Sequence, residues 1–316
     1  MISIIIPTYN RASLIPETLN SILNQTCKDW ECIVVDDGST DATEDVMKSY
    51  EKKDPRIKFY KRPHSKPKGA NACRNYGFGL SKGELVHFFD SDDIMHHEHL
   101  EKKQQAFNNN DKLDFCICKT QKFEREFNFE NLREKSDIKI TDNIYEDYIL
   151  GRCPILMITP TWKREILTNM ELFDENLYQS QDLELYSRIL SKYKNVEILS
   201  ETLIFVRRNN DSITTINGKL NIHIESFLEV KKRVIMQSPN NPKINLALIK
   251  MVLGTFRYKL AGKEYKDCKK CLDFIRTYNS NKSLRFLFSM LRINFFYQVF
   301  KVLGRGDTKF KSVLKL

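Results

Sequence analysis

Three aspartates within four residues follow directly on an apolar run, and they give the clearest chemical signal in the sequence. The run Val86–Phe89 leads into Asp90, Ser91, Asp92 and Asp93. Carboxylates this close repel one another, so they need a cation or strong hydrogen-bond donors to stay together. Carboxylate oxygens suit a hard divalent ion, Mg²⁺ or Mn²⁺, and such ions commonly bind substrate phosphates as well. The competing interpretation is a solvated acidic turn that caps a following helix.

The first hundred residues alternate between strand and helix patterns, which would place these aspartates at one edge of a sheet. The expected strands cover residues 2–6, 30–35, 57–60 and 84–89, and the expected helices begin near residues 13, 41 and 69. Such alternation predicts right-handed βαβ units and a mainly parallel sheet, in which ligands bind beyond the carboxyl ends of the strands. Polar residues follow three of the strands, at 8–11, 36–37 and 90–93. The sequence therefore predicts a nucleotide-type site at that edge.

Beyond residue 110 the pattern changes twice. Residues 111–218 look mixed, with expected strands near 115–119, 155–159 and 196–206, a helix over 182–190 and a polar, irregular segment over 122–140. From residue 219 onward, apolar residues recur at three- and four-residue spacing, which predicts helices. A chain of 316 residues is long enough for one large domain or two ordinary ones. We expect an α/β domain followed by a helical region.

The net charge of +10 is concentrated near the C-terminus. Residues 282–316 hold eight Lys and Arg but one acid, Asp307, so they contribute seven of the ten charges. A basic segment favours an anionic surface, and the interleaved phenylalanines favour a membrane over nucleic acid. We therefore expect peripheral membrane contact through 282–316 and no nucleic-acid binding. The alternative is a helical subdomain with a solvated basic face.

Two absences bear on location. The sequence contains no run of about 18 uncharged apolar residues, and no signal-peptide pattern precedes the first expected strand. The eight cysteines are scattered without zinc-site spacing, and reduced thiols fit a cytoplasmic protein. We expect a cytoplasmic location, including the inner face of a membrane.

Four motifs, in their order and spacing, closely resemble those of the family 2 glycosyltransferases. They are IPTYNR at 6–11, VVDDGSTD at 34–41, GANACRN at 69–75 and FDSDD at 89–93. The resemblance implies a GT-A fold with a nucleotide-sugar-binding half over 1–110 and an acceptor-binding half over 111–218, followed here by a basic, aromatic-rich helical region over 219–316. It also implies inverting transfer of a sugar from a UDP-sugar to an acceptor glycan or lipid-linked glycan, in surface polysaccharide or glycolipid synthesis.

The resemblance assigns the nucleotide contacts of the first two motifs to a short set of residues: Pro7, Thr8, Tyr9, Arg11 and Asp37. Tyr9 would stack on the base, and Asp37 would accept a hydrogen bond from the uracil N–H. Asp36 would either shape the turn or brace Asp37 from behind. Taken without the resemblance, Tyr9 also fits a core aromatic, and the aspartate pair fits an Asx turn before a helix.

The later motifs would hold the diphosphate and the metal. Arg74 would bond either to the diphosphate or to an aspartate of the acidic cluster; an ordinary ion pair on a helix surface is the alternative. Asp90 and Ser91 would contact the nucleotide, with Asp90 at the ribose. Asp92 would hold Mn²⁺ or Mg²⁺, and Asp93 would either ligate too or cap the next helix. The ion would neutralise the leaving diphosphate.

Inverting transfer needs one base to take the proton of the acceptor hydroxyl. By the resemblance this base is Asp182, which follows the segment Phe173–Glu175. Gln181 stands where the family usually has glutamate. The alternative for Asp182 is a helix cap. Trp162 lies in a segment like the acceptor side of the family, where it would either line a sugar platform or fill the core.

Three interpretations compete with or qualify this one. His96 and His99 have the spacing to share a helix face as metal ligands with His97 nearby, but oxygen ligands suffice without them. An NAD(P)-dependent oxidoreductase is excluded because no glycine-rich turn follows the first strand. A non-catalytic nucleotide-sugar-binding subunit or sensor remains the alternative function.

Overall fold

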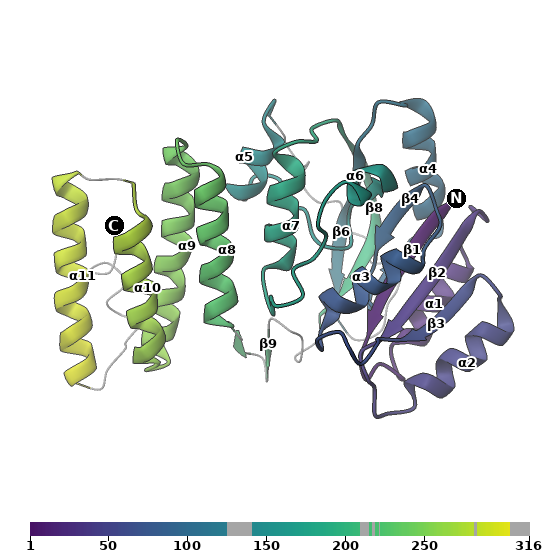
Figure 1. Ribbon diagram of the computed structural model, residues 1–316, viewed down its shortest axis with the longest axis horizontal. Helices are drawn as coiled ribbons and strands as arrows, with labels where there is room; N and C mark the ends of the chain where they lie inside the picture. The colour runs from purple at the N-terminus through teal and green to yellow at the C-terminus, as the bar shows by residue number, and fades with distance from the viewer. Residues whose placement is uncertain (125–140, 209–214, 217–218, 221, 281–282, 304–316) are drawn as a thin grey trace. The chain divides into compact units, whose positions relative to one another are not determined.

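The computed structural model of the protein describes residues 1–124, 141–208, 215–216, 219–220, 222–280 and 283–303. The chain divides into two compact units, Met1–Asn221 and Ile222–Leu316. The first unit is an α/β domain and the second consists of helices (Figure 1). The finer division into donor and acceptor halves at residue 110 stays a prediction.

The sheet of the first unit has eight strands in the order β3–β2–β1–β4–β7–β6–β8–β5. Its parallel part consists of β3 (Ile57–Lys61), β2 (Trp30–Asp36), β1 (Ile2–Thr8) and β4 (Leu85–Phe88). The remaining strands are β7 (Thr161–Lys163), β6 (Phe115–Phe123), β8 (Val196–Arg207) and β5 (Ile94–Met95). There β6 and β8 are parallel, while β7 and β5 run antiparallel to their neighbours. The expected α/β fold with a parallel first half is confirmed, and the second half is mixed.

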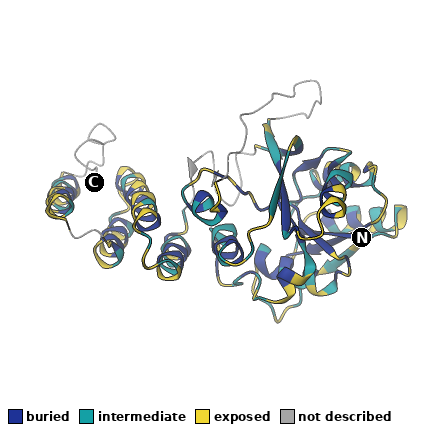
Figure 2. Cartoon of the chain, turned by 90° about the horizontal axis from the view of Figure 1, so that it is seen from above, coloured by how far each residue is buried: buried dark blue, intermediate teal, exposed yellow. Residues whose placement is uncertain are grey.

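Helices cover both faces of this sheet, and its strands are largely buried between them (Figure 2). One face carries α1 (Ile15–Leu23), α2 (Thr43–Lys53) and α4 (His99–Asn109). The other carries α3 (Ala70–Leu80), α5 (Ile144–Ile149), α6 (Arg164–Thr168) and α7 (Gln181–Leu190). In α1 the fully buried Ile15, Leu19 and Ile22 recur one turn apart, which turns one helix face onto the sheet.

Helix α3 lies unusually close to the sheet because of Gly77. A Cβ at this position would meet Ile5 Cγ2 at 2.6 Å and Val35 Cγ2 at 3.3 Å. A larger residue would push the helix away from β1 and β2. The close packing matters for function, because the same helix carries Arg74 towards the carboxyl ends of these strands.

One local expectation from the sequence is wrong. Residues 155–159 form no strand; the strand of this region is β7, which begins at Thr161. The helix expected to begin near residue 41 is α2, which has Ala42 as its N-cap, while Asp41 bonds to Thr43. Of the segment expected to be irregular over 122–140, the first two residues end β6, and residues 125–140 lie outside the described ones, so that expectation stays a prediction.

The second unit contains α8 (Ile224–Gln237), α9 (Pro242–Ala261), α10 (Tyr265–Tyr278) and α11 (Leu284–Val302). β9 (Thr215–Ile216) and β10 (Lys219–Leu220), the last strands of the first unit, form a small antiparallel pair. Within the described ranges, no helix combines the length and apolar character needed to cross a bilayer. Asn241 starts α9 firmly, because its Oδ1 accepts the N–H groups of Lys243 and Ile244 at 3.1 Å each.

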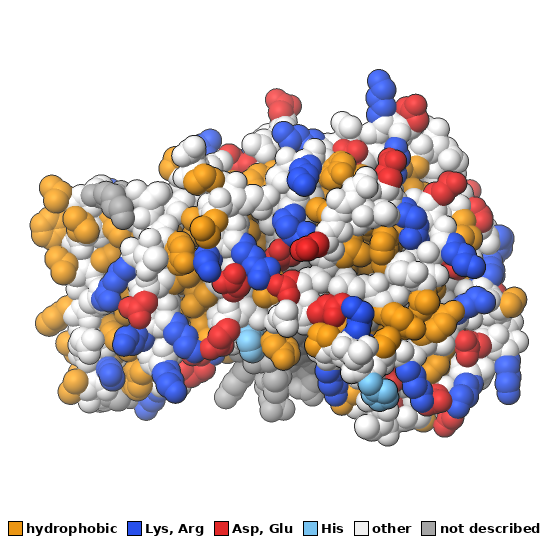
Figure 3. Space-filling view, in the orientation of Figure 1, with side chains coloured by type: hydrophobic (Ala, Val, Ile, Leu, Met, Phe, Trp, Pro, Cys, Tyr) orange, Lys and Arg blue, Asp and Glu red, His pale blue; other side chains and the backbone are white. Residues whose placement is uncertain are grey.

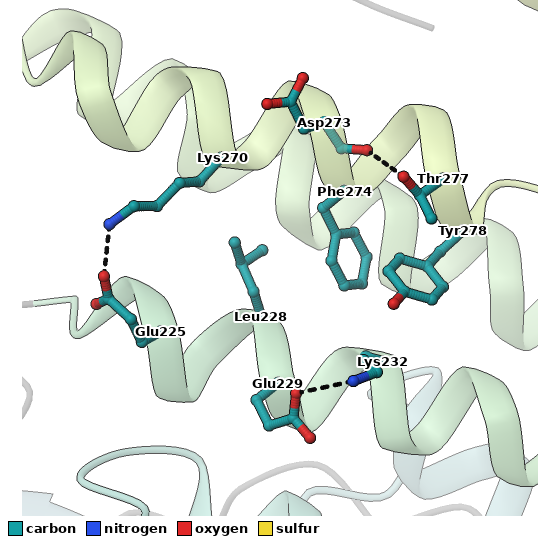
Figure 4. Close-up of a pocket in the computed structure, with 9 residues that line it drawn as sticks. All are labelled: Glu225, Leu228, Glu229, Lys232, Lys270, Asp273, Phe274, Thr277 and Tyr278. Carbon is teal, nitrogen blue, oxygen red and sulfur yellow. Dashed lines mark hydrogen bonds and ion pairs between the residues drawn. The ribbon is translucent and has the colours of Figure 1, made fainter.

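A depression of about 550 Å³ lies between α8 and α10 (Figure 4). Its floor is apolar, with Leu228 and Phe274, and its rim is charged. The rim charges are already paired within the unit: Glu225 with Lys270, and Glu229 with Lys232 at 3.4 Å. We therefore assign this depression no ligand.

Two buried histidines lie side by side between β4 and α4. The rings of His87 and His99 are 4.8 Å apart between centroids, and neither side chain is exposed. Burial, reinforced by the nearby Lys103 charge, lowers the pKa of His87 to about 3. Burial and His87 also hold the pKa of His99 well below its usual value. Both rings are therefore neutral in the folded protein.

This pair makes stability depend on pH. The unfolded chain binds protons near the ordinary histidine pKa of about 6.5, whereas the folded protein does not, so the free energy of unfolding falls as pH drops below that value. We expect denaturant titrations to show a clear loss from about pH 7 to about pH 5. His99→Leu should flatten this dependence, whereas His97→Leu, at an exposed position, should not. The same pH slope in wild type and His99→Leu would contradict this account.

Candidate functional site

The turn after β2 is organised by Asp36. Its Oδ2 accepts the N–H groups of Gly38 at 3.1 Å and Ser39 at 2.9 Å, and Ser39 Oγ donates to its Oδ1. This is the turn chemistry expected for Asp36. Asn10 ties the turn to the end of β1, since its N–H donates to Ser39 Oγ at 2.8 Å and its Oδ1 accepts the N–H of Thr40 at 2.8 Å. Its left-handed φ of 50° is uncommon for a side-chain-bearing residue.

Asp37 lies beside this turn with 8% of its surface exposed. Its Oδ1 receives two donors, Arg62 Nε at 2.5 Å and the N–H of Gly69 at 3.0 Å. The N–H of Asp37 itself donates to the Thr8 carbonyl at 2.8 Å. Gly69 reaches Asp37 with a φ of 141°, where other residues would be strained. Asp37 therefore joins the ends of β1 and β2 to the start of α3.

Tyr9 follows β1 directly and is 40% exposed, so the core-aromatic alternative is wrong. Lys68 Nζ lies 4.1 Å from the centre of its ring, a cation–π contact. Pro7 and Thr8 are buried at the end of the strand, and Thr8 Oγ1 has no hydrogen-bond partner among the described residues. The strand end thus presents one flat aromatic surface beside a cation.

Arg74 is a buried cation that faces the acidic cluster. Its side chain is 5% exposed, and its Nη2 lies 2.8 Å from Asp90 Oδ1. This confirms a bond to an aspartate of the cluster and excludes the ordinary surface ion pair. Its Nε and Nη1 have no hydrogen-bond partner within the described part of the chain. Buried guanidinium donors without acceptors are costly, which makes them natural contacts for an anionic ligand.

The other two aspartates differ in their surroundings. Asp92 is half-buried, with Arg11 Nε 3.7 Å from its Oδ2. Asp93 is 4% exposed, and its Oδ1 accepts the N–H of Arg207 at 2.9 Å. Asp93 caps no helix, because the strand β5 follows it and α4 begins only at His99. Ser91 is also buried. Asp92 is thus the more accessible carboxylate.

The electrostatics of the cluster fit a divalent cation. Burial, followed by repulsion from Asp90, raises the pKa of Asp92. Burial, Asp90 and Asp92 together raise the pKa of Asp93 well above its usual range. Arg11 and Arg207 oppose these shifts only in part. Uncompensated negative charge on oxygen ligands is what Mg²⁺ and Mn²⁺ neutralise.

Two amides on α3 hold a distant segment against this edge. Asn71 Nδ2 donates to the carbonyls of Asp174 at 2.8 Å and Leu177 at 3.1 Å. Asn75 donates to the Phe173 carbonyl at 2.8 Å and accepts its N–H at 3.1 Å. Neither role was predicted from the sequence, although the four-residue spacing of Asn71 and Asn75 places both on the same helix face as Arg74. Segment 173–177 leads directly into α7.

Asp182 lies in the first turn of α7 and is half-buried. The N-cap is Ser180, so Asp182 does not occupy the capping position that the alternative required. Ser180 has a left-handed φ of 61°, a conformation that is enriched at functional sites. After burial, the charges of Asp182 and Asp90 both raise the pKa of the Tyr186 hydroxyl. Both carboxylates thus act on the same buried hydroxyl, which itself donates to the Met157 carbonyl at 3.1 Å.

Burial shows that two roles suggested by the sequence, an acceptor contact for Trp162 and metal ligation by His99, are wrong. Trp162 is fully buried, its ring stacked on Phe115 with centroids 4.5 Å apart, so it fills the core instead of lining a sugar platform. His99 is buried against His87, while His96 precedes the helix, so the two do not share a helix face. His96, His97 and Glu98 bring ligand-type atoms within 4.8 Å of one another, in a group that does not include the aspartates.

Two basic residues of this site, Arg62 and Arg207, were not predicted from the sequence. Arg62 bonds Asp37, and Arg207 joins three segments: its N–H donates to Asp93, its Nε to the Asp92 carbonyl at 3.1 Å, and its Nη2 pairs with Glu17 at 2.5 Å. Arg207 ends β8, more than a hundred residues after the aspartates. Only the pairing of β8 with β5 brings it to them.

The sequence of residues 3–169 matches the model of a family described as Glycosyl transferase family 2. A glucosyltransferase of Campylobacter jejuni, named for GalNAc(5)-diNAcBac-PP-undecaprenol, is 29% identical over 280 residues, covering 86% of each chain. An uncharacterized glycosyltransferase of Rickettsia bellii is 32% identical over 217 residues, or 68% of this chain and 30% of the relative. The chain thus spans about a third of the length of the Rickettsia relatives it matches.

Among solved structures, residues 1–349 of TarS from S. aureus, in complex with UDP-GlcNAc, superpose with a TM-score of 0.68. The sequence identity is 20%, with 96% of this chain and 89% of that chain covered. At this identity the likeness establishes the fold, which agrees with the GT-A architecture expected from the motifs.

The tie between α3 and segment 173–177 can be tested through stability. Asn71→Ala removes two hydrogen bonds and leaves their carbonyl acceptors unpaired. We expect the free energy of unfolding to fall by about 1–3 kcal/mol in urea titrations. Asn108→Ala, at an exposed position in α4, is the control and should stay within about 0.5 kcal/mol of wild type. Equal effects of the two substitutions would show that the amide does not hold the segment.

Proposed function

Because the chain belongs to glycosyl transferase family 2, we propose that it transfers a sugar from a nucleoside diphosphate sugar, preferably a UDP-sugar, to an acceptor hydroxyl with inversion at the anomeric carbon. One observation carries this proposal. A single helix, α3, contacts Asp90 through Arg74 and holds segment 173–177, which leads to Asp182. The residues proposed for donor binding and for proton transfer are therefore fixed to one scaffold.

The donor would lie along the carboxyl ends of β1, β2 and β4. Tyr9 offers its ring to the base once Lys68 moves aside, and both described contacts of the Asp37 carboxylate use Oδ1, which leaves Oδ2 for the base N–H. Asp90 and Ser91 would contact the ribose side. Arg11 and Arg74 would approach the diphosphate. The Nε and Nη1 of Arg74, which have no partner in the ranges that the structure describes, support this assignment.

A divalent ion, Mn²⁺ or Mg²⁺, would be held by Asp92, with Asp93 as the second candidate ligand. The raised pKa values of both carboxyls, caused by burial and mutual repulsion, support such an ion. When bound, it would supply positive charge that offsets the charge of the departing diphosphate. Asp93 would contribute less directly, because its Oδ1 already accepts the N–H of Arg207.

Asp182 would act as the base. Its carboxylate would accept the proton of the acceptor hydroxyl while that oxygen attacks the anomeric carbon. A nucleoside diphosphate is a good leaving group, so a second carboxyl acting as an acid, such as glycosidases use, is not needed. Burial of Trp162 leaves the acceptor contacts to residues other than this one.

For the acceptor we propose a lipid-linked glycan of surface polysaccharide or glycolipid synthesis, handled at the inner face of a membrane. The name of the Campylobacter relative, which contains an undecaprenyl diphosphate carrier, supports this class. The competing function is a non-catalytic nucleotide-sugar-binding subunit. It predicts the same donor site but no role for Asp182.

Asp182→Asn separates these two functions. We expect donor affinity, measured by calorimetry, to change little, while the transfer rate falls by about 10²- to 10⁴-fold because the amide cannot accept the proton. Asp45→Asn is a matched control, because Asp45 is also an acid in the first turn of a helix but is exposed on α2. Unchanged turnover in Asp182→Asn would remove this residue from the mechanism.

The metal requirement and the preference for the nucleobase of the donor are tested in one donor-hydrolysis screen. UDP-, GDP- and dTDP-sugars are compared with Mn²⁺ or Mg²⁺ and after chelation. We expect the UDP-sugars to be favoured, chelation to suppress turnover, and Asp92→Asn to weaken Mn²⁺ binding as followed by calorimetry. Activity indifferent to the chelator would contradict the metal assignment while leaving the test of Asp182 intact.

A further inference from the structure

Helix α11 exposes an apolar stripe along one side. Six of its side chains are between 49% and 85% exposed although all are large and hydrophobic: Leu284, Leu287, Phe288, Leu291, Phe295 and Val302. In Figure 3 hydrophobic side chains group along the side of α11 turned away from α10. At 100° per residue these six positions fall within about 60° of one line along the helix. Gln298 is the polar residue among them.

The opposite face of α11 already has its own core. Met290, Ile293, Tyr297 and Phe300 are buried, Tyr297 donates to the Tyr265 carbonyl at 3.1 Å, and its ring lies 5.9 Å from that of Phe256. The stripe is therefore not a core face left unpacked within the helical unit. A helix that is apolar on both faces is stable in water only if something covers its second face.

The charges of α11 indicate which kind of partner surface fits the stripe. The helix contains Arg285, Arg292 and Lys301 but no Asp or Glu, and all three cations are exposed. By the same helical geometry they lie about 80–100° from the middle of the stripe, on both of its sides. Basic residues that flank an apolar stripe match a surface with anionic headgroups above an apolar layer.

We propose that α11 lies flat on an anionic membrane, with the stripe inserted among the lipid acyl chains and its flanking cations at the phosphates. The helix does not cross the bilayer, in keeping with its three charges. A second copy of the chain fits less well, because two such faces would bring six cations together without a single acid between them.

The membrane contact expected for residues 282–316 is thereby placed on one helix face. It rests on the proposed function only for its biological purpose, which is to bring the enzyme to a lipid-linked acceptor. The contact itself is independent of the donor site. It can therefore fail while sugar transfer is confirmed, and the reverse is also true.

The test is flotation of the full chain, without donor, on phosphatidylcholine vesicles with and without about 30% phosphatidylglycerol. We expect binding to the anionic vesicles only. Leu291→Glu and Phe288→Glu, both at exposed positions, should each weaken it by at least about tenfold, since each removes an inserted group and adds a negative charge. Met236→Glu is the matched control: Met236 is 63% exposed on α8, away from the stripe, and its substitution should weaken binding far less.

A second pair of measurements separates insertion from simple charge attraction and from dimerisation. Arg285→Gln combined with Lys301→Gln should weaken binding to anionic vesicles, and high salt should weaken the wild type only in part. Analytical ultracentrifugation should give the same mass for wild type and Leu291→Glu. The proposal is overturned if the glutamate variants bind like wild type, if neutral vesicles bind as well as anionic ones, or if Leu291→Glu dissolves a wild-type dimer.

Discussion

The site depends on one buried charge, the guanidinium of Arg74. A cation taken out of water needs an anion close by, and Asp90 at 2.8 Å provides it. Because Gly77 lets α3 approach the sheet, this pair forms beyond the carboxyl ends of the strands. The same helix fixes Asn71 and Asn75, and these two amides make five hydrogen bonds that hold segment 173–177 to the proposed nucleotide side. Moving α3 would disturb both halves of the proposed reaction.

The acidic cluster is tolerated because its charges are distributed over different partners. Asp90 has Arg74, Asp92 has Arg11 at a longer distance, and Asp93 accepts a backbone N–H from Arg207. Raised pKa values at Asp92 and Asp93, from burial and mutual repulsion, show that the compensation is incomplete. A site with residual negative charge on oxygen atoms, beside Arg74 donors that lack acceptors among the described residues, is suited to an ion and a diphosphate together. It would bind each of them less well alone.

The two units of the chain differ in how much of their structure can be predicted from sequence. In the first unit the alternation of strands and helices places the polar motifs at one sheet edge, which is a matter of backbone direction and needs no side-chain detail. In the second unit, spacing predicts helices but not which apolar residues face solvent. Residues 284–302 place apolar side chains on every side of the helix, and only packing against α9 and α10 shows that one face is covered and the other is a stripe.

Local pattern and spacing are enough to predict the parallel α/β half, the acidic cluster after β4, the turn at Asp36 and the family. The burial of Trp162, which stacks on Phe115, and of His99, which packs on His87, depends instead on residues that meet only in the folded chain. Tertiary structure also revealed Arg62 and Arg207, whose partners are distant in sequence and meet only through strand pairing. The type of a residue limits which contacts it can make, and packing in the folded chain determines which of these contacts it does make.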